Sequence, residues 1–224
     1  MKLRLSYIIA TLLIMSACEA SGIADVTGGK NYELYDYYVD KHGNEGIVIY
    51  KQSKKSGEGT YILVLSLDES ECTWGKEGES VADNDTSIRD YDERALFLNQ
   101  RATYLGLDKF PAFKWCLAKN HSKEYPDINS WILPSLYHNS RLIPGVLQTK
   151  HELINRHIVE YGGTPLTKDA YYWLADEPSM TYTDHDVSDY KHSLAFSLSG
   201  NYILPKETMA KVRAVKCIRY DQSR

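Results

Sequence analysis

Two short runs of β-branched and aromatic residues, at 46–50 and 61–65, flank a polar segment that contains two glycines. Runs of this length with such boundaries predict two strands joined by a long loop into a β-hairpin. Near the other end of the chain, residues 194–198 alternate between apolar and polar side chains, and a Ser-Gly-Asn turn separates them from an apolar run at 202–204. This alternation predicts a second pair of strands with a tight connection.

Three segments between these strands have helical patterns. The first is 93–105, and the second, 110–119, has Pro111 in its first turn, where the missing N–H leaves no hydrogen bond unmade. The third runs from about 147 to 161 and is followed by two glycines, which suit a left-handed C-cap. A terminal strand is expected at 212–218. Strands, then helices, then strands predict one α+β domain, with an antiparallel sheet meander and two to three helices.

The amino terminus has the pattern of an export signal. Lys2 and Arg4 form a basic start, and residues 5–15 form an apolar stretch that is too short to span a bilayer. The Met-Ser-Ala-Cys sequence that follows resembles the lipobox of bacterial lipoproteins, in which the cysteine, here Cys18, receives the lipid and becomes the first residue of the mature protein. Ordinary signal cleavage after Ala20 is the alternative.

The chain is therefore expected to divide into three parts: a lipoprotein signal peptide at 1–17, a flexible tether at 18–34 and a folded domain at 35–224. Residues 19–30 are small and polar, as in linkers. A lipid on Cys18 would anchor the protein to a membrane. The expected location is the cell envelope, at the outer membrane or the cell surface.

The composition is that of a globular protein, with 43% hydrophobic and 25% charged residues. The 26 basic residues are outnumbered by 30 acidic ones, which gives a formal net charge of -4, and no run of basic residues occurs. Binding to a phosphate backbone requires a basic patch. Nucleic acid is therefore not an expected partner.

An odd number of cysteines, Cys72, Cys116 and Cys217, remains when Cys18 is lipidated. In an oxidising compartment at most one intramolecular pair can form from these three. A bond between Cys116, on the second predicted helix, and Cys217, in the terminal strand, would join the two and close a long loop, which the chain-entropy model values at up to about 4.7 kcal/mol. Cys72 would then be a free thiol, interpreted as a small buried side chain.

Several short motifs resemble those of the Lcl C-terminal domain family, which is similar to the fibrobacter major paralogous domain. They are Trp-Ile-Leu-Pro-Ser at 131–135, Tyr-Tyr-Trp at 171–173, Val-Arg-Ala-Val-Lys-Cys at 212–217, the strand at 46–50, Cys-Thr-Trp-Gly at 72–75 and the helix at 111–116. The chain departs from the family pattern at Leu174-Ala175, where two serines are usual, and in the spacing of Cys217.

This resemblance covers about residues 35–220 and implies a C-type lectin-like fold in a bacterial surface protein. In that fold a helix cysteine bonds to a cysteine on a late strand, which implies the pairing of Cys116 with Cys217. Trp131 and Trp173 lie inside the motifs and are expected to be core anchors. The family also suggests adhesion, because some members bind sulfated glycosaminoglycans, but the acidic balance of this chain argues against binding a polyanion through nonspecific charge.

Catalytic motifs in the sequence are incomplete. His151-Glu152 begins a zinc-hydrolase pattern, but Asn155 occupies the position where the second histidine must lie. The Glu177-Pro178-Ser179 tripeptide resembles the Glu-Pro-Asn with which lectins bind sugar through Ca²⁺, without its asparagine. No phosphate-binding glycine loop, nucleophile elbow or dinucleotide fingerprint is found. We therefore expect no enzymatic activity and no cofactor.

The most concentrated set of polar donors lies near residue 185. Its oxygen and imidazole groups could hold a divalent cation, which makes a metal-dependent enzyme a third hypothesis, although a solvated acidic loop is the simpler interpretation. Tyrosine, with 18 residues, is the most abundant aromatic side chain, and it suits recognition surfaces and stacking against sugar rings. The candidate binding residues are Tyr182, Asp184, His185, Asp186, Asp189 and His192.

Together these patterns predict a non-catalytic cell-envelope lipoprotein that binds a glycan or another surface macromolecule. The alternative is a structural minor subunit of a fimbrial or outer-membrane assembly, which would pack against protein partners. The expected partners are therefore a glycan or a surface protein, together with the membrane through the lipid anchor.

Overall fold

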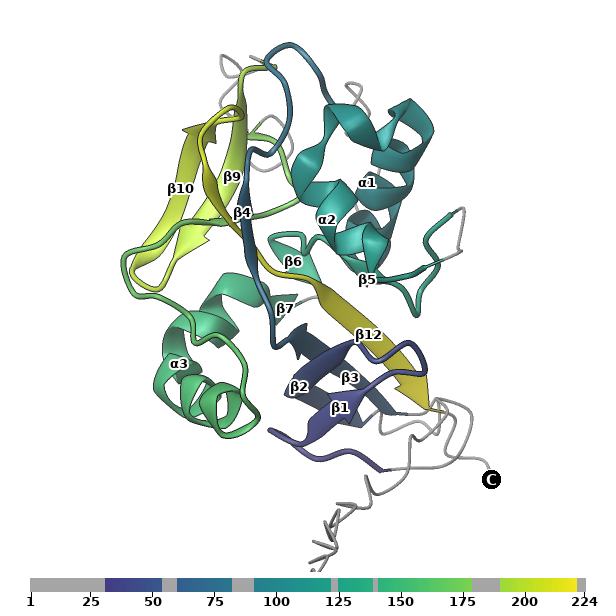
Figure 1. Cartoon of the computed structure of the whole chain (residues 1–224), viewed down its shortest axis with the longest axis vertical. Coiled ribbons are helices and arrows are strands. Elements are labelled where there is room, and N and C mark those ends of the chain that lie inside the picture. The colour runs from purple at the N-terminus through teal and green to yellow at the C-terminus, as the bar shows by residue number, and fades with distance from the viewer. Residues whose placement is uncertain are drawn as a thin grey trace, which may run out of the picture.

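The computed structural model of this chain describes residues 31–53, 60–81, 91–121, 125–138, 141–178 and 190–220. Within these ranges the chain forms two five-stranded sheets, a two-stranded ribbon and three α-helices (Figure 1). The predicted α+β class is confirmed. The strands are divided between two sheets, however, and do not form a single meander.

The first sheet has the strand order β1-β2-β3-β12-β5, and every neighbouring pair in it is antiparallel. Its strands are β1 (Tyr37–Val39), β2 (Glu45–Ser53), β3 (Thr60–Ser66), β12 (Val215–Tyr220) and β5 (Trp131–Ile132). β2 and β3 are the predicted hairpin, with a register shift between Val48 and Tyr50. β3 is buried along its whole length, which explains why its sequence is a continuous apolar run.

The second sheet has the strand order β10-β9-β8-β11-β4. Its strands are β10 (Gly200–Pro205), β9 (His192–Ser197), β8 (Tyr172–Trp173), β11 (Ala210–Val212) and β4 (Ser70–Cys72), and the separate ribbon consists of β6 (Tyr137–His138) and β7 (Arg141–Leu142). β9 and β10 confirm the second predicted hairpin. β8 and β11 run parallel, whereas the other pairs are antiparallel.

Two consecutive pairs of strands cross directly from one sheet to the other, because β3 leads into β4 and β11 leads into β12 (Figure 1). The prediction of one terminal strand at 212–218 is therefore wrong. Arg213 and Ala214 separate two strands that belong to different sheets. Arg213 is buried at this crossing, where its guanidinium donates to the Ser66 carbonyl at 3.3 Å and to the Glu69 carboxylate at 2.6 Å.

The predicted helices are confirmed with small changes of boundary. They are α1 (Tyr91–Leu105), α2 (Pro111–Ala118) and α3 (Ile143–Glu160), with a 3₁₀ turn, η1 (Leu107–Lys109), between the first two. Pro111 occupies the first turn of α2 as expected. α3 begins about one turn earlier than predicted, and Gly162 beyond its end has a φ of 77°, which fits the expected left-handed cap.

Tryptophan side chains lie at the centre of the core. Trp131 and Trp173 are 0% and 1% exposed, so their expected roles as core anchors are confirmed. Trp74 is also fully buried, and its indole N–H donates to the Leu174 carbonyl at 2.7 Å. The indole N–H of Trp173 donates to the Cys72 carbonyl at 3.0 Å. The Trp173 bond joins β8 to β4, and the Trp74 bond joins the loop after β4 to the residue after β8.

The predicted disulfide between Cys116 and Cys217 is not formed in the structure. α2, which carries Cys116, packs on β5, β11 and β4. Cys217 lies on β12 opposite Leu63, past the two residues of β12 that pair with β5. Cys72 lies on β4, one of the strands on which α2 packs. Burial raises the pKa of Cys116 well above its ordinary value and that of half-buried Cys72 to about 11, so both thiols stay protonated at neutral pH.

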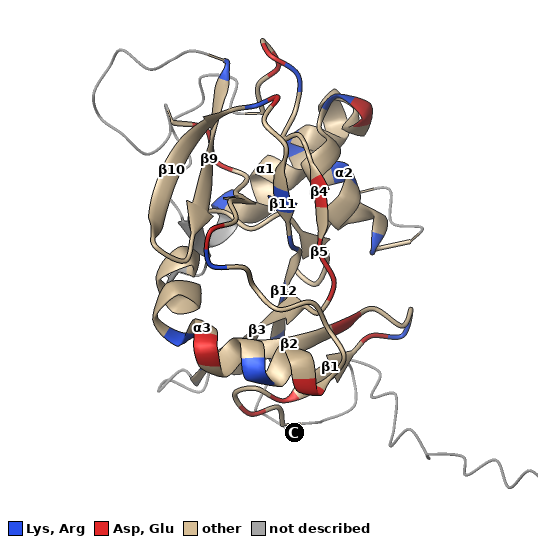
Figure 2. Ribbon diagram, turned by 60° about the vertical axis from the view of Figure 1, so that its left-hand side comes forward, with Lys and Arg blue, Asp and Glu red and all other residues tan. Residues whose placement is uncertain are grey.

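Charged side chains of both signs are distributed over the described elements, and Figure 2 shows them interspersed along α3. Some form exposed pairs, such as Lys114 with Asp108 at 2.6 Å. In the part of the chain that the structure describes, no helix has the length and apolar character that crossing a bilayer requires.

Candidate binding groove

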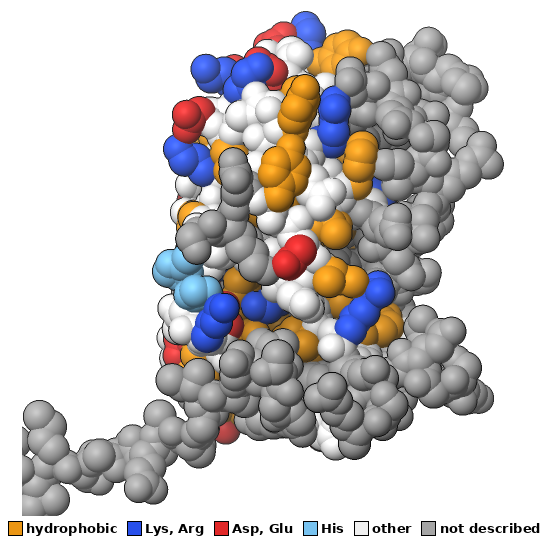
Figure 3. All heavy atoms as spheres, turned by 90° about the vertical axis from the view of Figure 1, so that its right-hand side faces the viewer, with side chains coloured by type: hydrophobic (Ala, Val, Ile, Leu, Met, Phe, Trp, Pro, Cys, Tyr) orange, Lys and Arg blue, Asp and Glu red, His pale blue; other side chains and the backbone are white. Residues whose placement is uncertain are grey.

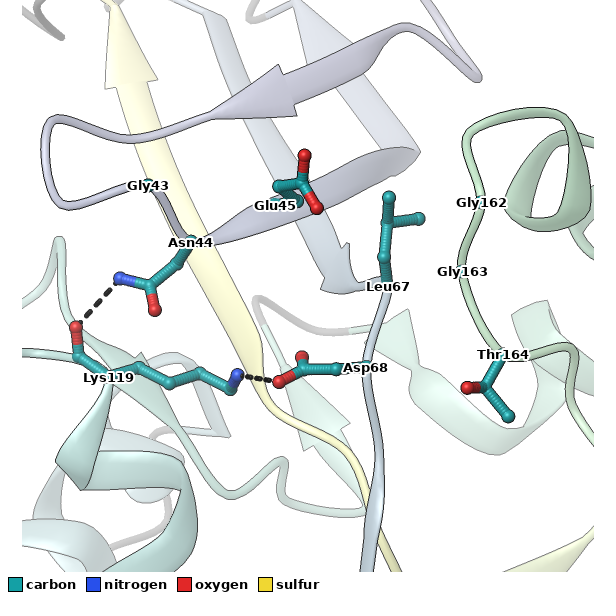
Figure 4. Close-up of a pocket in the computed structure, with 9 residues that line it drawn as sticks. All are labelled: Gly43, Asn44, Glu45, Leu67, Asp68, Lys119, Gly162, Gly163 and Thr164. Atoms are coloured by element: carbon teal, nitrogen blue, oxygen red, sulfur yellow. Dashed lines mark hydrogen bonds and ion pairs between the residues drawn. The ribbon is translucent and has the colours of Figure 1, made fainter.

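A groove of about 220 Å³ opens where four segments that are distant in sequence meet (Figure 4). These segments are the β1–β2 turn with the start of β2, the residues after β3, the residue after α2 and the residues after α3. The lining residues are Gly43, Asn44, Glu45, Leu67, Asp68, Lys119, Gly162, Gly163 and Thr164. We refer to this site as the groove.

The buried carboxylate of Asp40 holds the β1–β2 turn that forms one wall of the groove. One of its oxygens accepts from the backbone N–H groups of His42 at 2.9 Å and Asn44 at 3.0 Å. The other accepts from the Asn44 side-chain amide at 2.9 Å and from the indole of Trp131, on β5, at 2.8 Å. The ammonium of Lys216, on β12, lies 3.7 Å from the same carboxylate. Asp40 thus ties the turn to two other strands of the first sheet.

These contacts have opposing effects on the pKa of Asp40. Burial raises it, but the hydrogen bonds donated by Asn44, Trp131 and His42 together lower it by more, so the pKa lies below its ordinary value. A carboxyl whose pKa is lower in the folded state stabilises that state above its unfolded pKa. This contribution is lost as the pH falls through the folded pKa.

We therefore expect the free energy of unfolding to fall as the pH drops below about 4. In the Asp40→Asn variant, stability at neutral pH should be lower, because an amide cannot accept hydrogen bonds at both positions. Its decline below about pH 4 should be shallower, because the titrating group is gone. Denaturant unfolding over a pH series measures both effects. Parallel pH profiles for the two proteins would contradict this role of Asp40.

Lys119 and Asp68 form the floor of the groove. Their ammonium and carboxylate are 2.5 Å apart, and the Asn44 amide donates to the Lys119 carbonyl at 2.8 Å, as the dashed lines in Figure 4 mark. The Lys119 ammonium also lies 4.4 Å from the ring centroid of Trp115. Asp68 is 57% exposed, whereas Lys119 is 10% exposed. The carboxylate is therefore the accessible member of the pair.

The opposite wall is the Gly-Gly-Thr segment that follows α3. Gly163 closes the end of the helix by donating to the Ile158 carbonyl at 2.8 Å, and the next N–H, of Thr164, donates to the Leu67 carbonyl at 2.9 Å. A Cβ on Gly163 would lie 2.9 Å from the Leu67 backbone oxygen and from an Ile158 methyl group. Only glycine permits this close approach. The guanidinium of Arg213 donates to the Thr164 carbonyl at 2.5 Å, which fixes the wall from the other side.

Four aromatic side chains form a continuous row at the rim of the groove. Tyr37 donates its hydroxyl to Glu45, which lines the groove, and its ring lies 5.1 Å from that of Tyr161, the neighbour of Gly162. Tyr161 stacks on His157 at 6.4 Å, and His157 stacks on Tyr35 at 5.1 Å with the planes 4° apart. All four are partly exposed. We call these residues the aromatic rim.

The hydroxyl of Tyr37 remains a hydrogen-bond donor over the physiological pH range. Burial, together with the hydrogen bond and the negative charge of Glu45, raises the pKa of Tyr37 to about 12. Burial and the charges of Glu160 and Asp36 also raise the pKa of Tyr161. The groove therefore combines carboxylate acceptors, hydroxyl and amide groups, and aromatic faces. This is the chemistry of a site that binds a polar ligand with apolar patches.

The structure describes few of the residues that the sequence indicated for binding. Cys18 and five candidates, Tyr182, Asp184, His185, Asp186 and Asp189, lie outside the described residues. His192 is the first residue of β9, opposite Pro205. Among the described residues, no group of three or more His, Cys, Asp or Glu is arranged to hold a metal ion.

Glu177, considered above for its resemblance to a lectin tripeptide, belongs to a buried ion pair. Its carboxylate accepts from the Lys206 ammonium, from the Ser80 hydroxyl at 2.8 Å and from the Val81 N–H at 3.0 Å. It is only 3% exposed. This position gives Glu177 a structural role.

The residues of the groove were missed at the sequence level. The only sequence features that mark the groove residues are two glycine turns, one at Gly43 and one at 162–163. Gly43 and Gly162 both have a positive φ. Such glycines mark turns but do not show which turns meet. Tyrosine in general was expected to suit stacking against sugar rings, but Tyr35, Tyr37 and Tyr161 were not assigned to a binding site.

Neither the known family models nor the curated proteins include a match to this chain. Among solved structures, the chain is similar to a fimbrial protein from Bacteroides ovatus ATCC 8483, with 14% sequence identity and a TM-score of 0.46. The alignment covers 69% of this chain and 35% of the fimbrial protein, so it spans about a third of that protein's length.

Proposed function

We propose that this protein is a non-catalytic component of the cell envelope that binds a saccharide in the groove. The observation that carries the proposal is the position of the aromatic rim. Tyr37 and Tyr161 lie beside the groove, whose lining offers the carboxylates of Glu45 and Asp68 and the hydroxyl of Thr164. Aromatic faces next to clustered hydrogen-bonding groups suit a ligand that has C–H faces and many hydroxyls.

The size and charge of the groove narrow the ligand class. At about 220 Å³ it is smaller than sites for drug-sized molecules, which are about 300–1,000 Å³, so we infer that it holds a single sugar unit of a longer chain. Glu45 and Asp68 contribute negative charge and Lys119 is paired with Asp68. Because the net charge of these residues is negative, a neutral or amino sugar is favoured over a sulfated one.

The proposed location rests on the sequence. The basic and apolar start of the chain and the lipobox-like cysteine Cys18 support export and lipid anchoring. The resemblance to the Lcl family, which implies a C-type lectin-like fold, supports the same location. The groove does not depend on that fold or on the absent disulfide.

A glycan array followed by calorimetry with the full chain tests the proposal. Binding to one class of neutral or amino-sugar polysaccharide is expected. No binding to any polysaccharide on the array would contradict the proposal.

The Tyr161→Ala variant is expected to bind the selected glycan about tenfold more weakly, a loss of about 1.4 kcal/mol, because a stacking face at the rim is removed. Tyr104 on α1 offers a matched control, since it is 72% exposed and lies on a helix that does not line the groove. Tyr104→Ala should bind with unchanged affinity. Equal losses in the two variants would show that the rim does not bind the sugar.

A second candidate function is that of a minor subunit in a surface assembly. β10 favours it, because this six-residue strand lies at the edge of the second sheet with β9 as its neighbour, and Ile203 in it is 41% exposed. Crosslinking in cells followed by mass spectrometry distinguishes the two functions. A structural subunit should be recovered with a stoichiometric protein partner, whereas a glycan-binding protein should not.

A further inference from the structure

Two exposed histidines from different segments lie against one another beside the groove. His42 is in the β1–β2 turn and His121 follows α2, and their ring centroids are 4.4 Å apart with the planes 30° apart. Figure 3 shows histidine side chains in contact with one another on the surface of the molecule. Neither ring lines the groove or belongs to the aromatic rim.

The backbones that carry the two rings are fixed. The His42 N–H donates to Asp40 at 2.9 Å, and His121 has a φ of 55°, with its N–H donating to the Ala118 carbonyl at 3.3 Å. The Asn44 amide joins the two segments by donating to the Lys119 carbonyl at 2.8 Å. The fold therefore holds the two segments that carry the imidazoles next to one another.

The two rings are close enough for both to bind one metal ion once their side chains turn out of the stacked arrangement. A metal–nitrogen bond is about 2.0–2.1 Å and the ring centre lies about 1.1 Å further on, so two imidazoles bound at about 90–110° have centroids about 4.5–5.2 Å apart. In the structure the rings are stacked, with centroids 4.4 Å apart and planes 30° apart, so coordination requires both rings to turn and to move slightly apart. Because both side chains are exposed, rotation about their side-chain bonds can direct one nitrogen of each toward a common point.

The charges near the pair include the exposed Lys41, which precedes His42, but an exposed ammonium opposes a bound cation only weakly because solvent and salt screen it. The closest lysine along the chain on the α2 side, Lys119, has its ammonium paired with Asp68 and placed over the Trp115 ring. The Asp40 carboxylate lies two residues from His42 and bonds its backbone N–H. Imidazole nitrogens suit Zn²⁺, Cu²⁺ and Ni²⁺, whereas Ca²⁺ and Mg²⁺ prefer oxygen.

We propose that His42 and His121 form a two-histidine site for a divalent transition-metal ion, with water completing its coordination. Cu²⁺ binds more tightly than Zn²⁺, following the general order of divalent-metal affinities. Bound metal links the β1–β2 turn to the end of α2 and stabilises the folded protein.

The test is titration of the full chain, free of any histidine tag, with Zn²⁺ alone and with Cu²⁺ alone. One ion per chain and a rise in melting temperature with metal concentration are expected, while Mg²⁺ at the same concentrations has no effect. His42→Ala and His121→Ala should each weaken binding at least about tenfold, and the double variant should lose little more, because one imidazole alone no longer chelates.

His151→Ala is the matched control, since this histidine is partly exposed on α3 and bonds the Gln148 carbonyl. It should bind as the unchanged protein does. Melting temperatures without metal check that each variant is folded. No saturable Zn²⁺ or Cu²⁺ binding up to about 1 mM, or undiminished binding in the double variant, would overturn the proposal.

Discussion

Replacing Lys206 by alanine is expected to lower the free energy of unfolding by about 3–5 kcal/mol. The Lys206 side chain is fully buried, and its ammonium donates to the Glu177 carboxylate, to the Glu79 carbonyl at 2.5 Å, and lies 4.6 Å from the Trp74 ring centroid. Glu177 is 4% exposed at its side chain. Without the lysine, Glu177 is left as a buried negative charge that lacks its cationic partner, which is the main source of the loss.

The exposed pair of Lys114 and Asp108 provides the control. Their side chains are 58% and 92% exposed, so Lys114→Ala should cost less than about 1 kcal/mol. Denaturant unfolding of the two variants, followed by circular dichroism, gives both values. Similar losses for Lys206→Ala and Lys114→Ala would mean that the buried pair is not a principal contact.

A double replacement distinguishes the effect of the unpaired buried charge on stability from the effect of lost side-chain packing. In Lys206→Met combined with Glu177→Leu, both charges are removed together and apolar side chains of similar size take their place. We expect this protein to be more stable than Lys206→Ala, because no buried charge is left without a partner. If the double variant is as unstable as the single one, the loss arises from the shape of the site and not from its charge.

The elements that the sequence predicted correctly are those whose patterns arise from local rules. The hairpin of β2 and β3, the hairpin of β9 and β10, and α2 with Pro111 in its first turn are all set by residues close to one another. Gly162 likewise marks the end of α3 through its own backbone conformation.

What the sequence could not predict depends on pairing between distant residues. The division of the last strand into β11 and β12 occurs at Arg213, whose partner Glu69 is 144 residues away. An arginine there resembles an ordinary polar position in an alternating strand, although in the structure it is buried. Lys206 is buried for the same kind of reason, since its carboxylate partner lies 29 residues earlier.

The groove was even harder to predict from the sequence, because it forms only where four separate segments meet. No local pattern links the turn at Asn44 with the glycines after α3. The disulfide prediction failed in the same way, since it assumed that the first helix with a cysteine would lie against the closing strand, whereas α2 packs on β5, β11 and β4. Element type was therefore readable from local pattern, and the meeting of elements was not.

Replacing Trp131 by alanine is expected to cost about 3–5 kcal/mol of unfolding free energy, comparable to Lys206→Ala. The side chain is fully buried on β5 and packs edge-on against Tyr38 at 6.1 Å. Its backbone N–H and carbonyl both bond the Asn120 side chain at 2.7 Å. The Lys216 ammonium lies 5.7 Å from the Trp131 ring centroid, so the cavity would also remove a cation–π contact.

Trp131→Phe distinguishes the volume of the indole from its hydrogen bond. Phenylalanine keeps most of the ring but cannot donate to Asp40, so we expect a smaller loss, about 1–3 kcal/mol, as the carboxylate loses one of its donors. Asp40 also holds the turn that carries Asn44 and Glu45. The phenylalanine variant should therefore bind the groove's glycan more weakly while remaining folded, as urea unfolding and calorimetry would show. If Trp131→Phe has wild-type stability and affinity, the β1–β2 turn does not need the indole hydrogen bond. This result would contradict the proposed connection between the core and the groove.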